Sequence, residues 1–440
     1  MGAVSLLACY VVGYIKEVQP EFRSARIISH KNDTATRNTT DAIRISPHDV
    51  VTATAMPWAA RCIHHGKRYA RVFWNAHLND TTPTTTATDQ IIHSPPHWCT
   101  QDTYDRVSCK NDTQVLCEPK GLLFVKTPKT GSTTLARVVK RIAQNVAKRS
   151  NVDVCQHREN HVDGAGLWYR NRNPQHSFLM ASIRDPAKRA MSRFDWSYVT
   201  RHSHNSSAPI QLEDDFIQDY IMRKSTNVPT GCTSKGQGGY QLNYITMSFI
   251  PEWSAWNPDN PTQVKNSEHV EGHVQQAMMD YDFMLLNERM DDSLVILQLL
   301  LGLQAGDIVS LSYNVGGSYR YEHGNCKQLI KSVVSPGMQE FFQSDLWYAS
   351  NYGDYLLYAA VNASLDLTID RIGRERFDTA MQEFKRMEAK VNQICSQRVP
   401  FPCSATGTVL FHTDHPIPHD KIAQCIDNIV QQEVNEAVSS

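Results

Sequence analysis

Three features that would assign a function class at once are missing from this chain of 440 residues. Its formal net charge is only −1, so the whole chain lacks the positive surplus that favours nucleic-acid binding. None of its eleven cysteines forms a Cys-x-x-Cys pair, which argues against a zinc ribbon. No uncharged apolar run reaches the ~20 residues that a membrane-spanning helix usually needs. What the chain does have is 41% apolar residues, enough to bury a substantial core.

The N-terminus carries an uncharged apolar segment at residues 2–15, GAVSLLACYVVGYI. No basic residue precedes it and no clear small-residue cleavage site follows it. It therefore fits a signal h-region, a short anchor, an incomplete gene model or an ordinary buried segment. We favour a type II signal anchor at residues 1–18, with the rest of the chain in the lumen of the secretory pathway. Cleavage of this segment would instead give a secreted protein.

Cysteines and glycosylation sequons also indicate the secretory lumen, where disulfides persist and glycans are added. Setting Cys9 aside leaves ten cysteines, an even number, so we expect disulfides, with the pairing open. The sequons lie at Asn32, Asn38, Asn79, Asn111, Asn205 and Asn362.

The composition divides the chain into four parts. Residues 19–118 are polar, threonine-rich and poor in periodic apolar residues, so we predict a lumenal stem that is partly disordered, with some order near residues 58–74. Residues 119–392 are richer in periodic apolar residues and are predicted to form the main folded domain, and residues 393–440 form a cysteine-containing tail. A glycine-rich stretch at residues 230–240 reads as a surface loop or as a lid over a substrate.

The main folded domain alternates apolar strands with amphipathic helices. Short apolar runs at residues 121–127, 177–183 and 281–287 predict buried strands, and a helical pattern follows each one. Ser132 or Thr133 is placed to cap the first helix, and Pro186 suits the first turn of the second. Continuously apolar strands joined by helices predict a three-layer α/β/α fold with a central parallel sheet, similar to that of P-loop proteins.

The loop after the first predicted strand has the composition of an anion site. Unpaired N–H groups and the helix dipole at a helix N-terminus attract phosphate. The surroundings are basic, with fifteen Lys/Arg against five Asp/Glu between Lys126 and Arg201. The Walker A pattern fails here, because Lys126 stands where its first glycine should be and Ser132 where its lysine should be. The candidate phosphate-binding residues are Lys126, Pro128, Lys129, Thr130, Gly131, Ser132, Thr133 and Thr134.

Two motifs carry a resemblance to a known family. TPKTGSTT at residues 127–134 and IRDPAKRAMSRF at residues 183–194 resemble the 5′-phosphosulfate loop and the 3′-phosphate motif of Golgi carbohydrate sulfotransferases. Residues 281–303 and 352–384 further resemble segments of the galactose 3-O-sulfotransferase group, which includes galactosylceramide sulfotransferase. The resemblance covers about residues 119 to 390, discontinuously.

The resemblance implies a reaction and roles for particular residues. The donor would be 3′-phosphoadenosine-5′-phosphosulfate (PAPS), with no metal, and the acceptor a hydroxyl of a carbohydrate or glycolipid. By similarity to the family, Lys129 stabilises the leaving 5′-phosphate, whereas Arg184 and Ser192 hold the 3′-phosphate. Histidine is a suitable base for the acceptor hydroxyl. His161 fits this role better than His157.

Several readings stay open beside this one. Glu288 is a further candidate base. For Arg320, a contact to the nucleotide and a structural role are equally good explanations. Two histidine groups have metal-like spacing, but we read both as non-metal: Cys155, His157 and His161, and His412, His415 and His419. The competing function hypotheses are a P-loop kinase, and a catalytically silent protein of sulfotransferase fold that binds acidic glycans.

Overall fold

The computed structural model describes part of the chain. The described residues are 57–73, 95–100, 118–161, 165–199, 212–226, 241–247, 256–257, 260–264, 267–311, 319–322, 325–328, 334–398, 402–404, 406–410 and 419–439. The predicted signal anchor, the glycine-rich stretch at 230–240 and the histidines at 412 and 415 lie outside them. Among the described helices, none is both long and apolar enough to cross a membrane. The predicted division into anchor, stem, main folded domain and tail stays a prediction.

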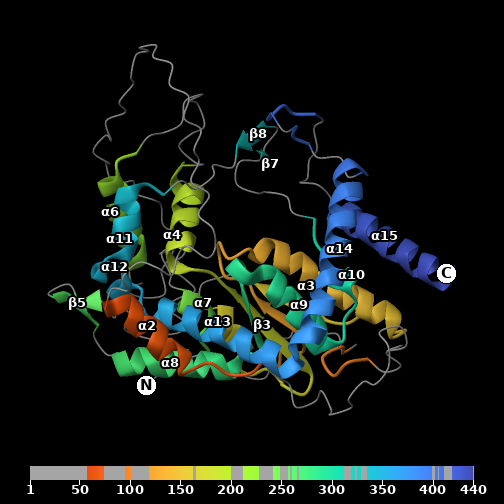
Figure 1. The fold of residues 1–440 in the computed structure, drawn as a ribbon, viewed down its shortest axis with the longest axis horizontal. Helices are drawn as coiled ribbons and strands as arrows, with labels where there is room; N and C mark the ends of the chain where they lie inside the picture. Colours follow the sequence, from red (N-terminus) through yellow and green to blue (C-terminus); the bar gives the residue numbers. More distant parts are fainter. Residues whose placement is uncertain are drawn as a thin grey trace, which may run out of the picture.

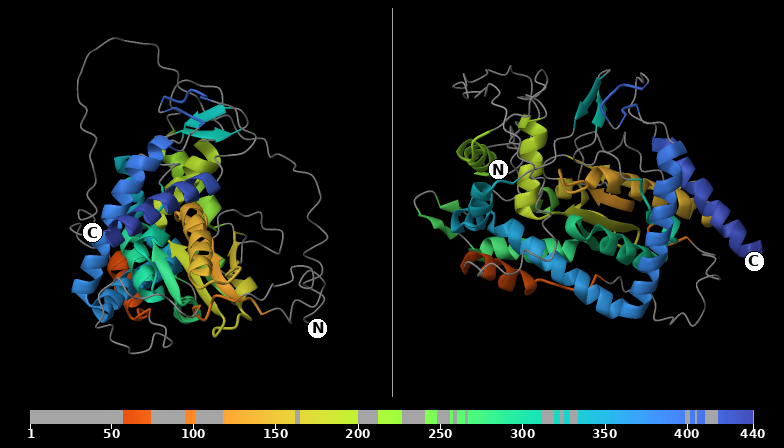
Figure 2. Two further views of the ribbon diagram at one scale, coloured as in Figure 1. Left: turned by 90° about the vertical axis from the view of Figure 1, so that its right-hand side faces the viewer. Right: turned by 45° about the horizontal axis from the view of Figure 1, so that its top comes forward.

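A parallel sheet of four strands forms the centre of the molecule, in the order β2-β1-β3-β6. These strands are β1 (Gly121–Val125), β2 (His157–Asn160), β3 (Ser177–Ile183) and β6 (Phe283–Leu286). β1, β3 and β6 are buried along their whole length, as continuous apolar runs in a covered parallel sheet should be. With helices on both sides of the sheet in Figures 1 and 2, the predicted three-layer α/β/α class is confirmed.

The edge strand β2 was not expected from the sequence. Its four residues, HREN, are all polar, and exposed and half-buried side chains alternate along it. It pairs in parallel with β1, Leu122 opposite His157 and Val125 opposite Asn160. β2 pairs with only one strand, and one of its faces is exposed to solvent. An edge strand of this kind does not need an apolar run, so the hydrophobic pattern did not indicate a strand here.

The helices surround this sheet (Figure 1). They are α2 (Pro57–Lys67), α3 (Ser132–Arg149), α4 (Pro186–Phe194), α6 (Asp214–Thr226), α7 (Gln241–Ile245), α8 (Ser267–Asp280), α9 (Met290–Leu301), α10 (Ala305–Ile308), α11 (Pro336–Gln343), α12 (Asp345–Ser350), α13 (Tyr352–Ile372), α14 (Arg374–Arg398) and α15 (His419–Ser439). Short helical turns η3 (Ala165–Tyr169), η4 (Asp195–Val199) and η5 (Asn287–Arg289) complete the helical elements. Two small antiparallel sheets pair β4 (Trp256–Asn257) with β5 (Asn260–Val264), and β7 (Tyr319–Glu322) with β8 (Asn325–Gln328).

The strand order creates a switch point between β1 and β3. From β1 the chain crosses through α3 to β2 on one side, and it then returns to β3 on the other side of β1. In open α/β sheets, ligands bind beyond the carboxyl ends of the strands where the direction of winding reverses. The segments that follow Val125 and Ile183 both leave the sheet at this point, because these residues end neighbouring parallel strands.

The predicted cap of α3 was wrong in detail. The helix begins at Ser132, and its N-cap is Gly131 in the left-handed conformation (φ 74°), without a side-chain capping bond. By contrast, Asp185 caps α4 by accepting from the backbone N–H of Lys188, and Pro186 occupies the first turn as expected.

Part of the predicted stem packs on the domain predicted for residues 119–392. α2 lies along α13, and both Cys62 and Phe73 are buried. The backbone N–H of Phe73 donates to the hydroxyl of Thr368 at 2.9 Å. This order agrees with the expectation for residues 58–74.

Disulfides were expected, and those in the described part of the chain supply the pairing that the sequence left open. Cys99 bonds to Cys155, Cys326 to Cys403, and Cys395 to Cys425. The last of these joins α14 to α15, which lie side by side in both views of Figure 2.

Candidate active site

The two motifs singled out in the sequence meet at the switch point. Nη1 of Arg184, directly after β3, donates to the backbone carbonyl of Lys129 in the loop after β1, at 3.1 Å. Nε of Arg189, one turn into α4, donates to the carbonyl of Pro128 at 3.0 Å. The 5′-type loop and the 3′-type motif are therefore one structural unit, although fifty-five residues separate Lys129 from Arg184.

The loop also has internal support. The fully buried hydroxyl of Thr130 lies 2.8 Å from the carbonyl of Thr127 and 2.6 Å from the hydroxyl of Ser182 on β3. Thr130 is thus part of the loop's scaffold, so anything it offers to an anion would come from its backbone. Gly131 packs closely as well: a Cβ at this position would lie 2.6 Å from Oδ1 of Asn287.

The two lysines of the loop point to different sides. Lys129 has a positive φ of 64°, and its ammonium lies 4.6 Å from the centre of the Trp196 ring. Trp196 belongs to η4, the helical turn that directly follows α4 and its Ser192. The ammonium of Lys126 instead lies 3.7 Å from the carboxylate of Glu159 on β2. Lys129 therefore faces the 3′-type motif, and Lys126 faces the sheet edge.

Arg184 is held in a partly desolvated place. Its Nε lies 3.7 Å from Oε1 of Glu288, whose other oxygen accepts from the backbone N–H of Asp185 at 3.0 Å. Burial lowers the pKa of Arg184 and raises the pKa of Glu288. Both oxygens of Glu288 therefore contact the segment that follows β3. These contacts argue for a structural role of Glu288 and against its role as the base.

The backbone at Arg184 is held by two further residues that were not among the predicted site residues. The side-chain amide of Gln241 accepts from the N–H of Arg184 and donates to its carbonyl, both at 2.7 Å. The buried carboxylate of Asp354 accepts in turn from the N–H groups of Gln241 and Leu242, at 2.9 and 3.0 Å. Gln241 lies outside the predicted motifs. Asp354 lies within the segment 352–384 that resembles the family, but no role was predicted for it.

The two candidate histidines lie on the β2 side of the loop. Nδ1 of His161 is 2.6 Å from the backbone carbonyl of Lys126. A carbonyl oxygen can only accept, so Nδ1 carries the proton, and Nε2 of the neutral ring holds the lone pair. His157 is part of β2 and lines the groove along α3; burial, and then the charge of Lys140, lower its pKa.

The remaining candidate residues are placed less closely around the switch point. Ser132 is buried at the start of α3, whereas Thr133 is exposed and Thr134 half-buried. Ser192 is half-buried on α4, two turns after Arg184. Arg320 belongs to β7, outside the central sheet, and its side chain lies outside the described part of the structure.

The metal-like sequence patterns find no assembled ligand set in the described residues. Cys155, the first residue of one pattern, is bonded to Cys99 and so has no thiolate to offer.

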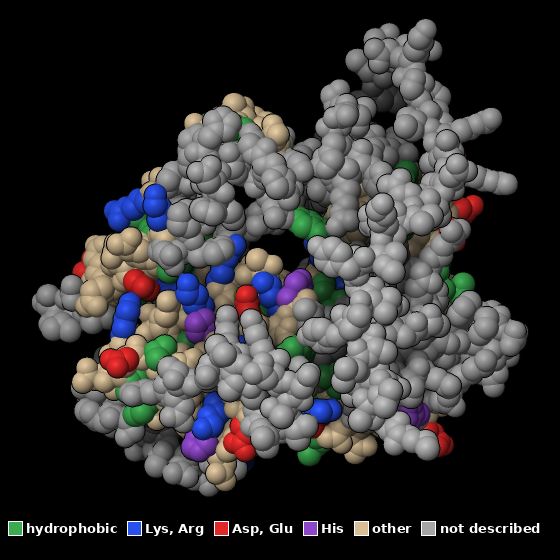
Figure 3. Space-filling view, turned by 180° about the vertical axis from the view of Figure 1, so that it is seen from behind, with side chains coloured by type: hydrophobic (Ala, Val, Ile, Leu, Met, Phe, Trp, Pro, Cys, Tyr) green, Lys and Arg blue, Asp and Glu red, His purple; other side chains and the backbone are tan. Residues whose placement is uncertain are grey.

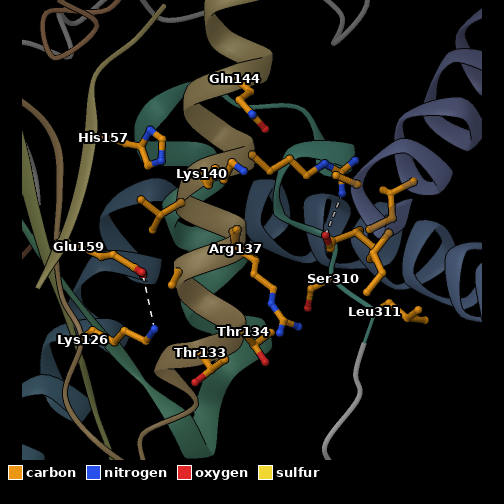
Figure 4. A pocket seen from close by; sticks show the side chains of 18 of the residues that line it. Lys126, Thr133, Thr134, Arg137, Lys140, Gln144, His157, Glu159, Ser310 and Leu311 are labelled. Carbon is orange, nitrogen blue, oxygen red and sulfur yellow. Dashed lines mark hydrogen bonds and ion pairs between the residues drawn. The ribbon is translucent and has the colours of Figure 1, made fainter. Parts of the chain in front are cut away.

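A groove of about 360 Å³ runs along α3 from the end of the loop. Figure 4 shows His157 and Glu159 on one flank of α3 and Ser310 and Leu311 on the other, so that α3 forms the floor. The groove includes Lys126, Thr133 and Thr134, and it is continuous with the candidate site. On the face seen in Figure 3, Lys and Arg side chains gather together with histidines in the left half of the view.

Comparisons with known proteins give relatives but no structural neighbour. No family model matches the chain, and no solved structure matches it significantly. Galactosylceramide sulfotransferase of Homo sapiens is 23% identical over 309 residues, which cover 63% of this chain and 65% of the relative. The protein of the same name from Bos taurus is 21% identical over 309 residues, with the same coverage. The match thus spans just under two thirds of the relatives' length. This chain is similar to galactosylceramide sulfotransferases, and the resemblance predicted from its motifs is confirmed.

Proposed function

We propose that this protein transfers a sulfuryl group from PAPS to a hydroxyl of a carbohydrate, on galactose of a glycolipid or glycan. The observation that carries this proposal is the bond from Arg184 to the carbonyl of Lys129, which brings both phosphate motifs to one switch point. The named relatives support the same reaction class.

The donor would bind across the ends of β1 and β3. The backbone N–H groups at the start of α3 favour the 5′-phosphosulfate, with the helix dipole adding to their effect. Arg184 and Ser192 would take the 3′-phosphate. The buried Nε of Arg184 makes no hydrogen bond within the described structure, and the Glu288 carboxylate lies 3.7 Å from it. A guanidinium fits phosphate oxygens through parallel hydrogen bonds.

The reaction requires positive charge where the leaving oxygen becomes negative. In-line group transfer of this kind depends mainly on positioning and electrostatic stabilisation. We assign this role to Lys129, whose ammonium already lies on the side of the 3′-type motif. Lys126, paired with Glu159, would serve the sulfuryl end of the donor.

We assign the general base to His161. Its Nδ1 donates to the loop backbone, which leaves the Nε2 lone pair to accept the proton of the attacking hydroxyl. The bond forms between the acceptor oxygen and sulfur as the bond from sulfur to the 5′-phosphate oxygen breaks. The proton moves to His161, and 3′-phosphoadenosine-5′-phosphate (PAP) leaves.

Two measurements test this function. Calorimetry should give tight binding of PAP and none of ATP, whereas a P-loop kinase would give the reverse. Incubation with radiolabelled PAPS and a panel of galactosides, glycosaminoglycans and small alcohols should then label a galactoside. Binding of PAP without transfer to any acceptor would instead favour a silent binding protein.

We further propose a Golgi location in the lumen, with residues 1–18 as a type II anchor. Disulfides between described cysteines, such as Cys395–Cys425, agree with an oxidising compartment. Asn362 is the sequon that falls in the described part of the chain; it lies within α13, and its Oδ1 accepts from Arg289 at 3.0 Å. Glycans, if present, are therefore expected at the other sequons.

A further inference from the structure

The groove along α3 lies on the side of the loop away from the proposed donor. The donor would extend from the loop toward Arg184 at the end of β3, whereas the groove extends from Lys126 toward β2. Because β1 lies between β2 and β3, a molecule in the groove would approach the loop from the opposite direction to the nucleotide. The groove therefore has the position of an acceptor site, and His161 bonds to the backbone of Lys126, one of the residues that line it.

The lining of this groove is strongly basic. It includes five cationic side chains and one carboxylate: Lys126, Arg137, Lys140, Arg141 and Arg158, and Glu159. Glu159 pairs with Lys126 at 3.7 Å, and Asp427 of α15 pairs with Arg141 at 3.0 Å. Among the lining residues themselves, cationic side chains therefore outnumber carboxylates by five to one. A neutral sugar would not require this surplus, because hydroxyl groups need neutral donors and acceptors.

The groove-lining side chains of α3 form one stripe, with the basic residues Arg137 and Lys140 in its middle. Thr133, Arg137, Lys140 and Gln144 follow the spacing i, i+4, i+7, i+11 on α3 and all line the groove. Figure 4 shows the Arg137 side chain reaching toward Ser310 across the floor of the groove. Burial lowers the pKa of Arg137 to about 10, so this cation stays charged at neutral pH in a partly desolvated place. The attraction between a cation and an anion is strongest in such partly desolvated surroundings, because the effective dielectric constant is low there.

Apolar side chains complete the other wall. Val309, Leu311 and Ile422 line the groove opposite β2. Sugar rings have apolar faces as well as polar edges, so a wall of this kind suits a chain of pyranoses. The stripe spans about three helical turns, or roughly 16 Å, which is the length of a short oligosaccharide rather than of a single sugar.

We propose that this groove binds an acidic glycan as the acceptor, with a carboxylate or sulfate next to the sugar that receives the sulfuryl group. This inference rests on the proposed sulfotransferase function and narrows its substrate class. The reacting hydroxyl lies at the loop end of the groove, near Lys126 and His161. The neighbouring acidic sugar lies further along α3, and Arg137 and Lys140 bind its anionic group.

Two matched acceptors test the inference. A disaccharide of galactose linked to glucose and the same disaccharide with glucuronic acid in place of glucose differ by one carboxylate. We expect KM and the dissociation constant to be about tenfold lower for the acidic acceptor, since one charge-assisted hydrogen bond is worth about one decade in affinity. Lys140→Ala, Arg137→Ala and the double variant should remove this preference, with PAP binding unchanged.

Lys148→Ala is the matched control, because this lysine is also on α3 but 71% exposed and outside the groove lining. It should keep the preference for the acidic acceptor. Equal binding of both disaccharides by the unmodified protein, or a preference that survives in the double variant, overturns the acidic acceptor. Acceptor binding is measured by calorimetry as well as by turnover, so the two proposals fail separately. Selective binding without sulfuryl transfer supports the groove and refutes the reaction, and PAPS-dependent transfer without selectivity does the reverse.

Discussion

Nη1 of Arg184 donates to the backbone carbonyl of Lys129 at 3.1 Å, so the residue after β3 holds the loop after β1 in place. The same guanidinium lies 3.7 Å from Glu288 and has a buried Nε that no described hydrogen-bond acceptor satisfies. Arg184 thus connects the shape of the loop to the charge of the 3′-type motif. Loss of this side chain should affect both ends of the proposed donor site.

Arg184→Ala should weaken PAP binding by at least about a hundredfold, the value of one or two hydrogen bonds to a charged group. Isothermal calorimetry measures this, and circular dichroism checks that the variant is folded. Arg184→Lys keeps the charge but not the planar fork, and it should recover only part of the affinity. Lys188→Ala is the control, because Lys188 is exposed on the same helix. Affinity within threefold of the unmodified protein in Arg184→Ala would refute the 3′-phosphate assignment.

The roles of the two histidines can be separated by turnover. His161→Gln should lower kcat by about 10² to 10⁴ with PAP binding retained, because only the proton acceptor is lost. His157→Gln should lower kcat far less.

The pH profile gives an independent check. The pKa of His157 is lowered by burial and by Lys140, so a reaction that used His157 would stay active at a lower pH than an ordinary histidine allows. We expect the acidic limb of kcat to be unchanged in His157→Gln. If the acidic limb of the kcat profile shifts in His157→Gln, His157 is the base. Full activity in His161→Gln would show that His161 is not the base.

Most of the architecture could be predicted from the sequence because it depends on continuous apolar runs. Residues 177–183 were expected as a strand, and β3 spans the same residues. The edge strand β2 could not be predicted in this way, since its polar residues HREN need only one strand neighbour. The cap of α3 was also misjudged: a sequence shows which hydroxyl groups are near a helix start, but not that Gly131 takes the left-handed conformation there.

Site residues could be predicted only where they belong to a sequence motif. Arg184, Lys129 and the loop follow from local patterns, and the structure brings them together. Gln241 and Asp354 were not selected, because neither belongs to the two phosphate motifs. Gln241 bonds to the backbone of Arg184, fifty-seven residues earlier, and Asp354 bonds to the backbone of Gln241, 113 residues earlier. The basic groove was equally hidden, since its two flanks come from β2 and from residues 309–311, which meet only in the fold.

Glu271 should contribute to stability in a pH-dependent way. It accepts hydrogen bonds from Tyr69 and Tyr352, both at 2.6 Å, and it lies 3.2 Å from Nδ1 of His65. Burial alone would raise its pKa, but the hydrogen bonds from Tyr352, Tyr69 and His65 outweigh burial and lower the pKa below its ordinary 4.5. A lowered pKa means that the stabilisation is present above the ordinary pKa and is lost as the pH falls through the folded-state value.

Glu271→Gln should therefore lower the free energy of unfolding by about 1–3 kcal/mol at pH 7, because the tyrosine hydroxyls lose a charged acceptor. The loss should shrink below pH 4.5, where the carboxylate itself becomes protonated. Thermal unfolding of both proteins between pH 3 and pH 7 measures this difference. Glu268→Gln, at an exposed position of α8, should leave the curve unchanged. Parallel curves for Glu271→Gln and the unmodified protein across this range would contradict the assignment.

Two glycines with similar backbones provide the sharpest test of the loop. Gly131 has φ 74° and Gly302 has φ 62°, so alanine at either position carries the left-handed strain of about 1–2 kcal/mol. A Cβ at Gly131 would in addition lie 2.6 Å from Oδ1 of Asn287 and 3.0 Å from Cε of Met290, whereas at Gly302 it meets nothing within 4 Å. Gly302→Ala should therefore lower stability by the strain alone and leave PAP binding intact.

Gly131→Ala should lower stability further and weaken PAP binding at least tenfold, because the displaced loop misdirects its N–H groups. Asn287→Ala in the Gly131→Ala background removes the closest contact and should restore part of both losses. Equal destabilisation in the two glycine variants, with PAP affinity unchanged in both, would mean that the tight packing of Gly131 does not shape the anion site.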